Sequence, residues 1–376
     1  MKTLNEFFEY YADRYANNKM MLEKTGNHYK ASTYNEIREK VHQFAAGLIQ
    51  LGLKKGDRVS LISEGRNAWV ISELGILYAG GVNVPLSVKL QDGSDLKFRI
   101  NHSSSRYVII SGAQARKISS IKNELKSVEK IIYLDPREEY ASNELFFGDI
   151  LKDGNEYLKN NQEKVEKTWR SLKEDDLANI CYTSGTTADP KGIMLTHRNY
   201  TANVEQALSL MNIPETYCTL LILPWDHSFA HTAGIYSVIA SGASMAAIQA
   251  GKTPLETLRN IPNNIKEVKP SFLLSVPSLA KNFRKNIEKN IRDKGKFLDK
   301  LFHHALRVAY KYNQDGWNKG KGWRILLKPY YKIFDSIIFK KIREGFGGRL
   351  DFFIGGGALL DIELQRFFYA IGMPMY

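Results

Sequence analysis

A cluster of hydroxyl, glycine and lysine residues lies between Tyr182 and His197, where a strand-like run gives way to small residues. Its chemically relevant members are Thr183, Ser184, Gly185, Thr186, Thr187 and Lys191. A turn of this kind exposes successive backbone N–H groups, and the hydroxyls and the ammonium add further donors. Such donors suit a polyphosphate, whose oxygens are many, negative and closely spaced. The stretch is not a Walker A loop, because Gly192 follows the lysine where that loop has serine or threonine.

The same residues have a simpler interpretation as a solvated turn, since clusters of Ser, Thr and Gly usually mark loops and nothing more. The density of the pattern favours the phosphate interpretation. Hydroxyls and glycines are followed at once by the rigid Pro190 and by the compact charge of Lys191. We therefore predict a phosphate-binding loop here.

This loop resembles the phosphate-binding signature of the AMP-forming acyl-adenylate ligases, the superfamily of acyl-CoA synthetases, luciferases and peptide-synthetase adenylation domains. The family usually has glycine where this chain has Ala188. The resemblance implies that residues 183–187 and Lys191 hold the β- and γ-phosphates of ATP. It also implies that Thr183 and Lys191 take part in catalysis.

Two further segments follow in the order that the family shows. An isolated histidine in an apolar context is more often a core residue, but the Leu-Pro-x-x-His spacing that ends at His227 resembles the family's aromatic/His segment. His227 is then expected as a catalytic residue that borders the acyl carboxylate and the α-phosphate. His231 is expected at the pocket mouth, where some fatty-acid-activating relatives keep a bulky gate residue. Gly356, Gly357 and Ala358 resemble the adenine-contacting segment, and bare backbone there lets a flat ring approach closely.

The elements that must position these residues alternate between strands and helices. Apolar runs and periodic segments predict strands at 59–63, 82–86, 107–110 and 130–134, and helices at 67–78, 96–102 and 113–127. This alternation predicts an α/β fold of layered, mostly parallel sheets flanked by helices. The resemblance implies the same fold, the N-terminal domain of adenylate-forming enzymes.

The chain is long enough for two packed units. We expect a first α/β subdomain at 1–175 and a second at 176–376, which carries the phosphate loop and a basic helical insertion at 281–346. The polar stretch 136–173 is expected on the surface, and His197 is expected as a capping or surface residue. A small C-terminal domain of the family architecture is expected to be absent.

The insertion contains an amphipathic helix from Phe297 to Tyr312 and continues with aromatic and basic residues. One interpretation is a helix that packs its apolar face on the domain and leaves its lysines in water. The other is a basic amphipathic surface that touches anionic lipid headgroups. The insertion's length and place resemble the long-chain fatty acyl-CoA synthetases more than their short-chain relatives.

The net charge of +13 indicates a polyanionic partner such as ATP, coenzyme A or an anionic membrane surface. Nucleic acid is not expected, since no interleaved aromatic motif or zinc-finger spacing is present. The cysteines Cys181 and Cys218 fit no metal spacing and no disulfide framework, so we expect no metal-binding residues and free thiols in the cytoplasm. No signal peptide is expected. A peripheral position at the inner membrane face follows from the lipid interpretation of the insertion.

The reaction that the resemblance implies has two steps. A fatty acid carboxylate attacks the α-phosphorus of ATP, and coenzyme A then displaces AMP from the acyl-adenylate. Family members use Mg²⁺, whose main ligand we expect beyond Tyr376, and we therefore expect residues 1–376 alone to turn over poorly. Two alternatives remain open: a non-catalytic binder of nucleotide or acyl groups, and a basic module that docks on membranes.

Overall fold

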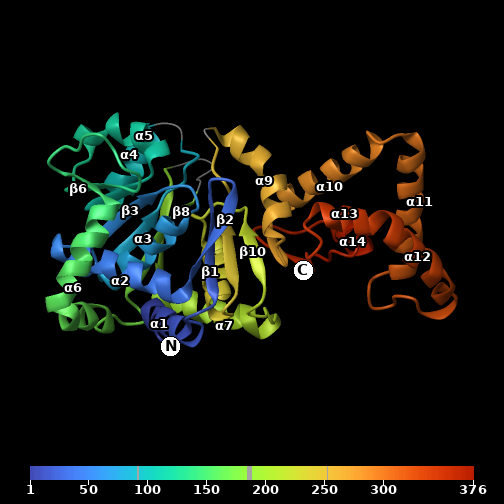
Figure 1. The fold of residues 1–376 in the computed structure, drawn as a ribbon, viewed down its shortest axis with the longest axis horizontal. Helices are drawn as coiled ribbons and strands as arrows, with labels where there is room; N and C mark the ends of the chain where they lie inside the picture. The colour runs from blue at the N-terminus through green and yellow to red at the C-terminus, as the bar shows by residue number, and fades with distance from the viewer. Residues whose placement is uncertain (91–92, 184–188, 252) are drawn as a thin grey trace. The chain divides into compact units, whose positions relative to one another are not determined.

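The computed structural model describes residues 1–90, 93–183, 189–251 and 253–376, and it divides into two compact units (Figure 1). Unit 1 comprises Met1–Thr216 and Pro224–Lys252, and unit 2 comprises Tyr217–Leu223 and Thr253–Tyr376. The subdomain boundary expected at residue 175 stays a prediction.

Unit 1 contains a seven-stranded sheet in the order β7-β6-β5-β3-β4-β8-β9. All neighbouring strands run parallel except β8 and β9, which form an antiparallel pair. The bounds are β3 Arg58–Ile62, β4 Val82–Pro85, β5 Tyr107–Ile110, β6 Lys130–Tyr133, β7 Glu144–Phe146, β8 Leu177–Thr183 and β9 Lys191–Thr196. The predicted fold class is confirmed.

Helices pack around this sheet through their apolar side chains, and α3 (Asn67–Tyr78) is buried on all sides from Trp69 onward. Their bounds are α1 Leu4–Arg14, α2 Tyr34–Gln50, α3 Asn67–Tyr78, α4 Gly93–His102, α5 Ala115–Ser119, α6 Phe147–Arg170 and α7 His197–Leu210. A capping box between Thr33 and Glu36 starts α2. The helix expected at 113–127 is instead broken into short turns around α5.

The segment expected as polar surface holds the long helix α6, which packs along α2. The helices approach so closely that a Cβ on Gly154 would lie 1.8 Å from the carbonyl oxygen of Gln43. Phe147, Ile150 and Trp169 on α6 are buried. The surface interpretation of 136–173 is therefore wrong for the buried face of α6.

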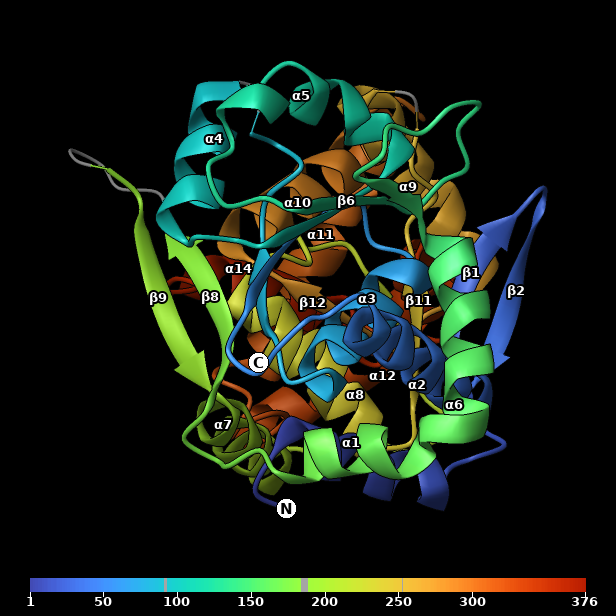
Figure 2. The same ribbon diagram turned by 90° about the vertical axis from the view of Figure 1, so that its left-hand side faces the viewer.

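Unit 1 also contains a group of three strands, of which two form a hairpin that the sequence analysis missed. Strand β1 (Lys19–Thr25) pairs antiparallel with β2 (His28–Thr33) and parallel with β11 (Ser244–Ala247). Figure 2 shows β1 and β2 as neighbouring blue arrows. A helical run with a π-helical turn at Ala230–Tyr236 continues into α8 (Ser237–Ala240) and leads to β11.

Unit 2 contains the parallel strands β10 (Cys218–Leu221), β12 (Phe272–Ser275) and β13 (Phe352–Gly355). Its helices are α9 Pro254–Val268, α10 Pro277–Arg292, α11 Lys296–Asn313, α12 Lys328–Phe334, α13 Lys340–Gly345 and α14 Ile362–Ala370. The predicted amphipathic helix is α11, which buries Phe302, Leu306 and Tyr312. Within the described ranges, no helix combines the length and apolar character needed to cross a bilayer.

Candidate active site

The ends of the predicted phosphate loop lie opposite each other in the β8–β9 pair of unit 1. Thr183 is the cross-strand partner of Lys191, and Tyr182 is the partner of Gly192. Figure 2 shows β8 and β9 as neighbouring strands. Both Thr183 and Lys191 are exposed. A hydroxyl and an ammonium therefore flank the mouth of the loop, and both are available to an anion. The remaining predicted loop residues, Ser184, Gly185, Thr186 and Thr187, lie outside the described residues, as does Ala188.

Helix α4 anchors the last residues of β8. The hydroxyl of Tyr182 lies 2.8 Å from Nδ1 of His102 and 3.2 Å from the carbonyl oxygen of Arg99. Burial raises the pKa of the Tyr182 hydroxyl, so this phenol stays neutral and can donate at pH 7. Gly192 leaves room opposite this residue, because a Cβ there would lie 2.9 Å from Cγ2 of Ile180 and that side chain would have to shift.

His227 lies exposed just before the helical run of residues 228–240. Its Nδ1 accepts a hydrogen bond from the backbone N–H of Phe229 at 3.2 Å. Because the amide can only donate, the neutral ring carries its proton on Nε2. His227 can thus present an Nε2–H donor to a carboxylate or phosphate oxygen.

Trp225 fixes the start of the loop that carries His227. Its indole lies directly on the backbone of Gly65, where a Cβ would come within 2.2 Å of Cε2 of the indole. The ring also packs edge-to-face on Trp69, with centroids 5.6 Å apart. Burial raises the pKa of the neighbouring Asp226, and the positive charge of protonated His231 or His227 would oppose this effect. Sequence reasoning did not identify this anchor, because Gly65 is far from Trp225 along the chain.

His231 is buried, and its expected place at the pocket mouth stays a prediction. Its ring stacks on Trp69 at a centroid distance of 5.4 Å. Its Nδ1 lies 3.3 Å from the Tyr200 hydroxyl, and its Nε2 lies 3.4 Å from Oε2 of Glu73. Burial lowers the pKa of His231, and the charge of Glu73 opposes this shift.

Glu73 belongs to the same buried polar cluster. Its Oε1 accepts hydrogen bonds from the Tyr236 hydroxyl at 2.7 Å and from Nδ2 of Asn179 at 3.1 Å. The carboxylate is only 1% exposed. These bonds offset the cost of burying it. The cluster packs beneath the His227 turn, since the His231 N–H donates to the carbonyl oxygen of His227.

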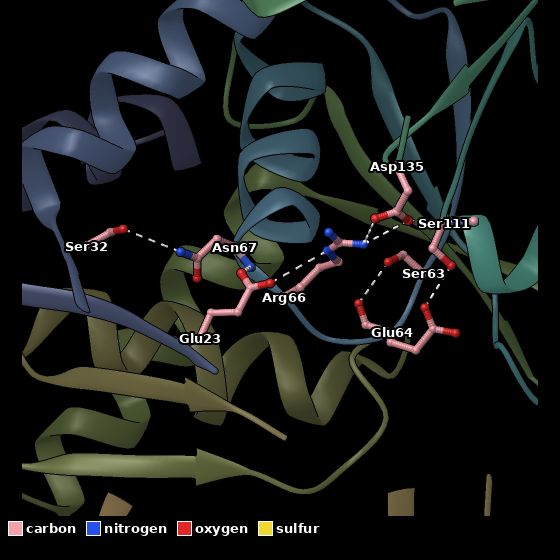
Figure 3. Close-up of polar contacts among 9 residues, drawn as sticks. Glu23, Ser32, Ser63, Glu64, Arg66, Asn67, Ser111 and Asp135 are labelled. Atoms are coloured by element: carbon pink, nitrogen blue, oxygen red, sulfur yellow. Dashed lines mark hydrogen bonds and ion pairs between the residues drawn. The ribbon is translucent and has the colours of Figure 1, made fainter. Parts of the chain in front are cut away.

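A second polar network lies at the carboxyl ends of β3, β5 and β6 (Figure 3). Arg66 reaches both carboxylate oxygens of Asp135 at 2.8 and 3.0 Å. Glu23 on β1 accepts the Asn67 backbone N–H at the start of α3. The Ser111 hydroxyl donates to Glu64 at 2.7 Å. Ligands of parallel sheets bind at the carboxyl ends of the strands. The network fixes the side chains at this edge of the sheet through hydrogen bonds and ion pairs within the protein.

The predicted adenine segment follows β13 in unit 2. Gly355 is the register partner of Ser275, so β12 and β13 end side by side. The Gly355 N–H donates to the Tyr376 carbonyl oxygen at 2.7 Å, and the Gly356 N–H donates to that of Ser275 at 3.1 Å.

The segment continues in a conformation that favours glycine. Gly357 has a φ of +80°. Gly357 and Ala358 are exposed, and Gly356 is half-buried. The assignment of all three residues to adenine stays a prediction, as do the roles of Thr183, Lys191 and His227.

Comparison with known proteins identifies similar chains. The family model described as AMP-binding enzyme matches residues 8–376. Long chain acyl-CoA synthetase 8 of Arabidopsis thaliana is 29% identical over 92% of this chain and 48% of its own length. The human long-chain-fatty-acid–CoA ligase ACSBG2 is 26% identical over 99% of this chain and 55% of its own length. The chain thus spans about half the length of the curated relatives it matches.

Solved structures share the fold. The N-terminal domain of FACL13 from Mycobacterium tuberculosis aligns with a TM-score of 0.66 at 19% identity, over 100% of this chain and 75% of that one. The anthranilate CoA ligase AuaEII in complex with anthranoyl-AMP aligns with a TM-score of 0.68 at 16% identity, over 99% of this chain and 58% of that one.

Proposed function

Because the chain belongs to the AMP-binding enzyme family, we propose that it takes part in the ATP-dependent activation of a long-chain fatty acid and its transfer to coenzyme A. The family match over residues 8–376 is the observation that carries this proposal. The similarity to long-chain acyl-CoA synthetases and long-chain fatty acid–CoA ligases supports the choice of acyl substrate.

The first step forms an acyl-adenylate. A carboxylate oxygen attacks the α-phosphorus of ATP, and the bond from that phosphorus to the bridging oxygen of pyrophosphate breaks. Negative charge builds up on the phosphates, so oriented donors and cations contribute most of the catalysis. Thr183, residues 184–187 and Lys191 hold the β- and γ-phosphates. His227 donates from Nε2 to the carboxylate or the α-phosphate, which lowers the repulsion between these two anions.

The second step transfers the acyl group. The coenzyme A thiol attacks the acyl carbon, the bond to the AMP oxygen breaks, and the thiol proton leaves to solvent. Gly356, Gly357 and Ala358 face the adenine ring and keep AMP oriented until it departs.

Mg²⁺ is implied by the family resemblance, and no step is assigned to it. In the described ranges, no group of three or more His, Cys, Asp or Glu side chains could hold a metal ion. A cytoplasmic location is part of the proposal, and it is supported by the buried Cys181, which forms no disulfide.

Titration calorimetry with ATP tests the phosphate assignment. We expect Lys191→Ala to weaken ATP binding about 10-fold or more, the effect of losing one hydrogen bond to a charged group. Lys152→Ala, which removes an exposed lysine from α6, is the matched control and should bind ATP normally. Unchanged affinity in the Lys191 variant would remove the phosphate-loop assignment.

Pyrophosphate exchange with hexadecanoate then separates binding from chemistry. In whichever form of the protein exchanges, His227→Ala should slow exchange more than it weakens ATP binding. ATP binding without any acid-dependent exchange would favour the alternative of a non-catalytic nucleotide binder.

A further inference from the structure

Residues 316–334 of unit 2, called here the basic-aromatic segment, expose large apolar side chains to solvent. Trp317 is 90% exposed, Leu326 is 69% exposed and Trp323 is 62% exposed. No residue from Gly322 to Phe334 is buried, although this stretch is rich in apolar side chains. Scattered single exposed residues are ordinary, but a concentration of this kind marks an interaction surface.

Contacts beneath the segment hold it in place. The Lys319 ammonium lies 5.2 to 5.7 Å from the ring centroids of Tyr312, Tyr331 and Tyr369. The Gly320 N–H donates to the carbonyl oxygen of Tyr312 at 2.9 Å. These contacts attach the segment to α11 and α14. The segment that carries the exposed tryptophan rings is therefore held in place by α11 and α14.

An ion pair secures the far end of the same surface. Arg343 on α13 donates to both oxygens of Asp335 at 2.7 and 2.9 Å. It also donates to the carbonyl oxygen of Ile371, just after α14, at 2.8 Å. Such a two-pronged bond orients the turn that follows α12. Figure 1 shows α11, α12 and α14 with this turn in orange and red.

The positive charge of the segment indicates an anionic partner. Its basic residues are Lys319, Lys321, Arg324, Lys328 and Lys332, and no Asp or Glu occurs between residues 316 and 334. Lysine is depleted from the cores of protein–protein interfaces, whereas tryptophan and tyrosine interleaved with lysine are typical of the bilayer interface. Anionic lipid headgroups complement this charge, and each lysine near them contributes about 1 kcal/mol.

We propose that the basic-aromatic segment docks the protein on the surface of an anionic lipid bilayer. Trp317, Trp323 and Leu326 enter the headgroup region, while Lys328 and Lys332 extend their ammonium groups to lipid phosphates or carboxylates. The protein lies on the membrane without spanning it. This inference does not rest on the proposed function.

Sedimentation with lipid vesicles tests the proposal, with the 376-residue chain, vesicles of phosphatidylcholine alone and vesicles with phosphatidylglycerol added. We expect binding to the anionic vesicles only, and release as salt rises. Lys328→Glu/Lys332→Glu should weaken binding about 30-fold or more, the equivalent of roughly 1 kcal/mol per lysine. Lys152→Glu/Lys167→Glu changes the net charge equally on α6 and should bind normally.

The apolar contribution is tested with Trp323→Ser/Leu326→Ser, which should also reduce vesicle binding. Leu210→Ser replaces a leucine in unit 1 that is 89% exposed, more than Leu326, and is its control. Circular dichroism verifies that each variant is folded. Absence of binding to anionic vesicles, or equal binding of the segment variants and their controls, would overturn the proposal. Self-association of the protein that Trp323→Ser/Leu326→Ser abolishes would also overturn the proposal, because the segment would then bind a second copy of the chain and not a membrane.

Discussion

Acidification should destabilise this protein through His197, the first residue of α7. The side chain is 1% exposed, and its Nδ1 accepts the backbone N–H of Leu4 at 3.2 Å. Burial lowers the pKa of His197 from its ordinary value of 6.5 to about 4. Lys55 lowers this pKa further, whereas Asp176 and Glu6 oppose the shift.

The sign follows from which state takes up the proton. Above pH 6.5 the histidine is neutral in both states and its contribution is constant. Between pH 6.5 and pH 4 the unfolded chain binds a proton that the folded chain does not. The free energy of unfolding therefore decreases as the pH is lowered through this range. The whole shift corresponds to about 3 kcal/mol at pH 4, of which about 2 kcal/mol is lost between pH 7.5 and pH 5.

Urea unfolding at a series of pH values between 7.5 and 5 measures this loss. His197→Asn keeps an acceptor near the position of Nδ1 but cannot titrate, so its stability should fall about 2 kcal/mol less than that of the wild type. His28→Asn removes an exposed histidine and is the control. Other acid-sensitive groups act equally in all three proteins. Parallel pH profiles for wild type and His197→Asn would refute the reasoning.

Three more outcomes are expected from close packing and burial. Gly154→Ala should destabilise the fold by about 3 kcal/mol in urea unfolding, because its Cβ would meet the Gln43 carbonyl oxygen and push two helices apart. Gly65→Ala should shift the tryptophan fluorescence and cost about 1–3 kcal/mol, because the new methyl group displaces Trp225; an unchanged spectrum would contradict the anchor. The native protein should show no rapid reaction of Cys181 with a thiol reagent at pH 8, because burial raises the pKa of this thiol to about 12.

The sequence by itself determined those helices and strands whose signals, such as capping residues and apolar periodicity, lie within the element or next to it. The helix Asn67–Tyr78 and the strand Tyr107–Ile110 have their predicted bounds. Thr33 starts its helix through a capping box with Glu36, only three residues further along the chain. For the candidate site, the strand before Thr183 was predicted, and the structure adds that Lys191 is its cross-strand partner.

Only the tertiary structure decided features whose partners are distant along the chain. His197 was expected as a capping or surface residue, and its burial depends on Leu4, which is 193 residues away along the chain. The surface interpretation is therefore wrong. The anchor of the His227 loop likewise required Gly65 and Trp225 to meet.

Helix α6 shows the physical reason. Glycine inside a helix costs about 1 kcal/mol relative to alanine, so Gly154 argues locally against a helix. In the folded chain this glycine lets α6 approach the backbone of α2, where any Cβ would collide with Gln43. The packing gained by that approach outweighs the local preference, and no pattern within the segment itself records it.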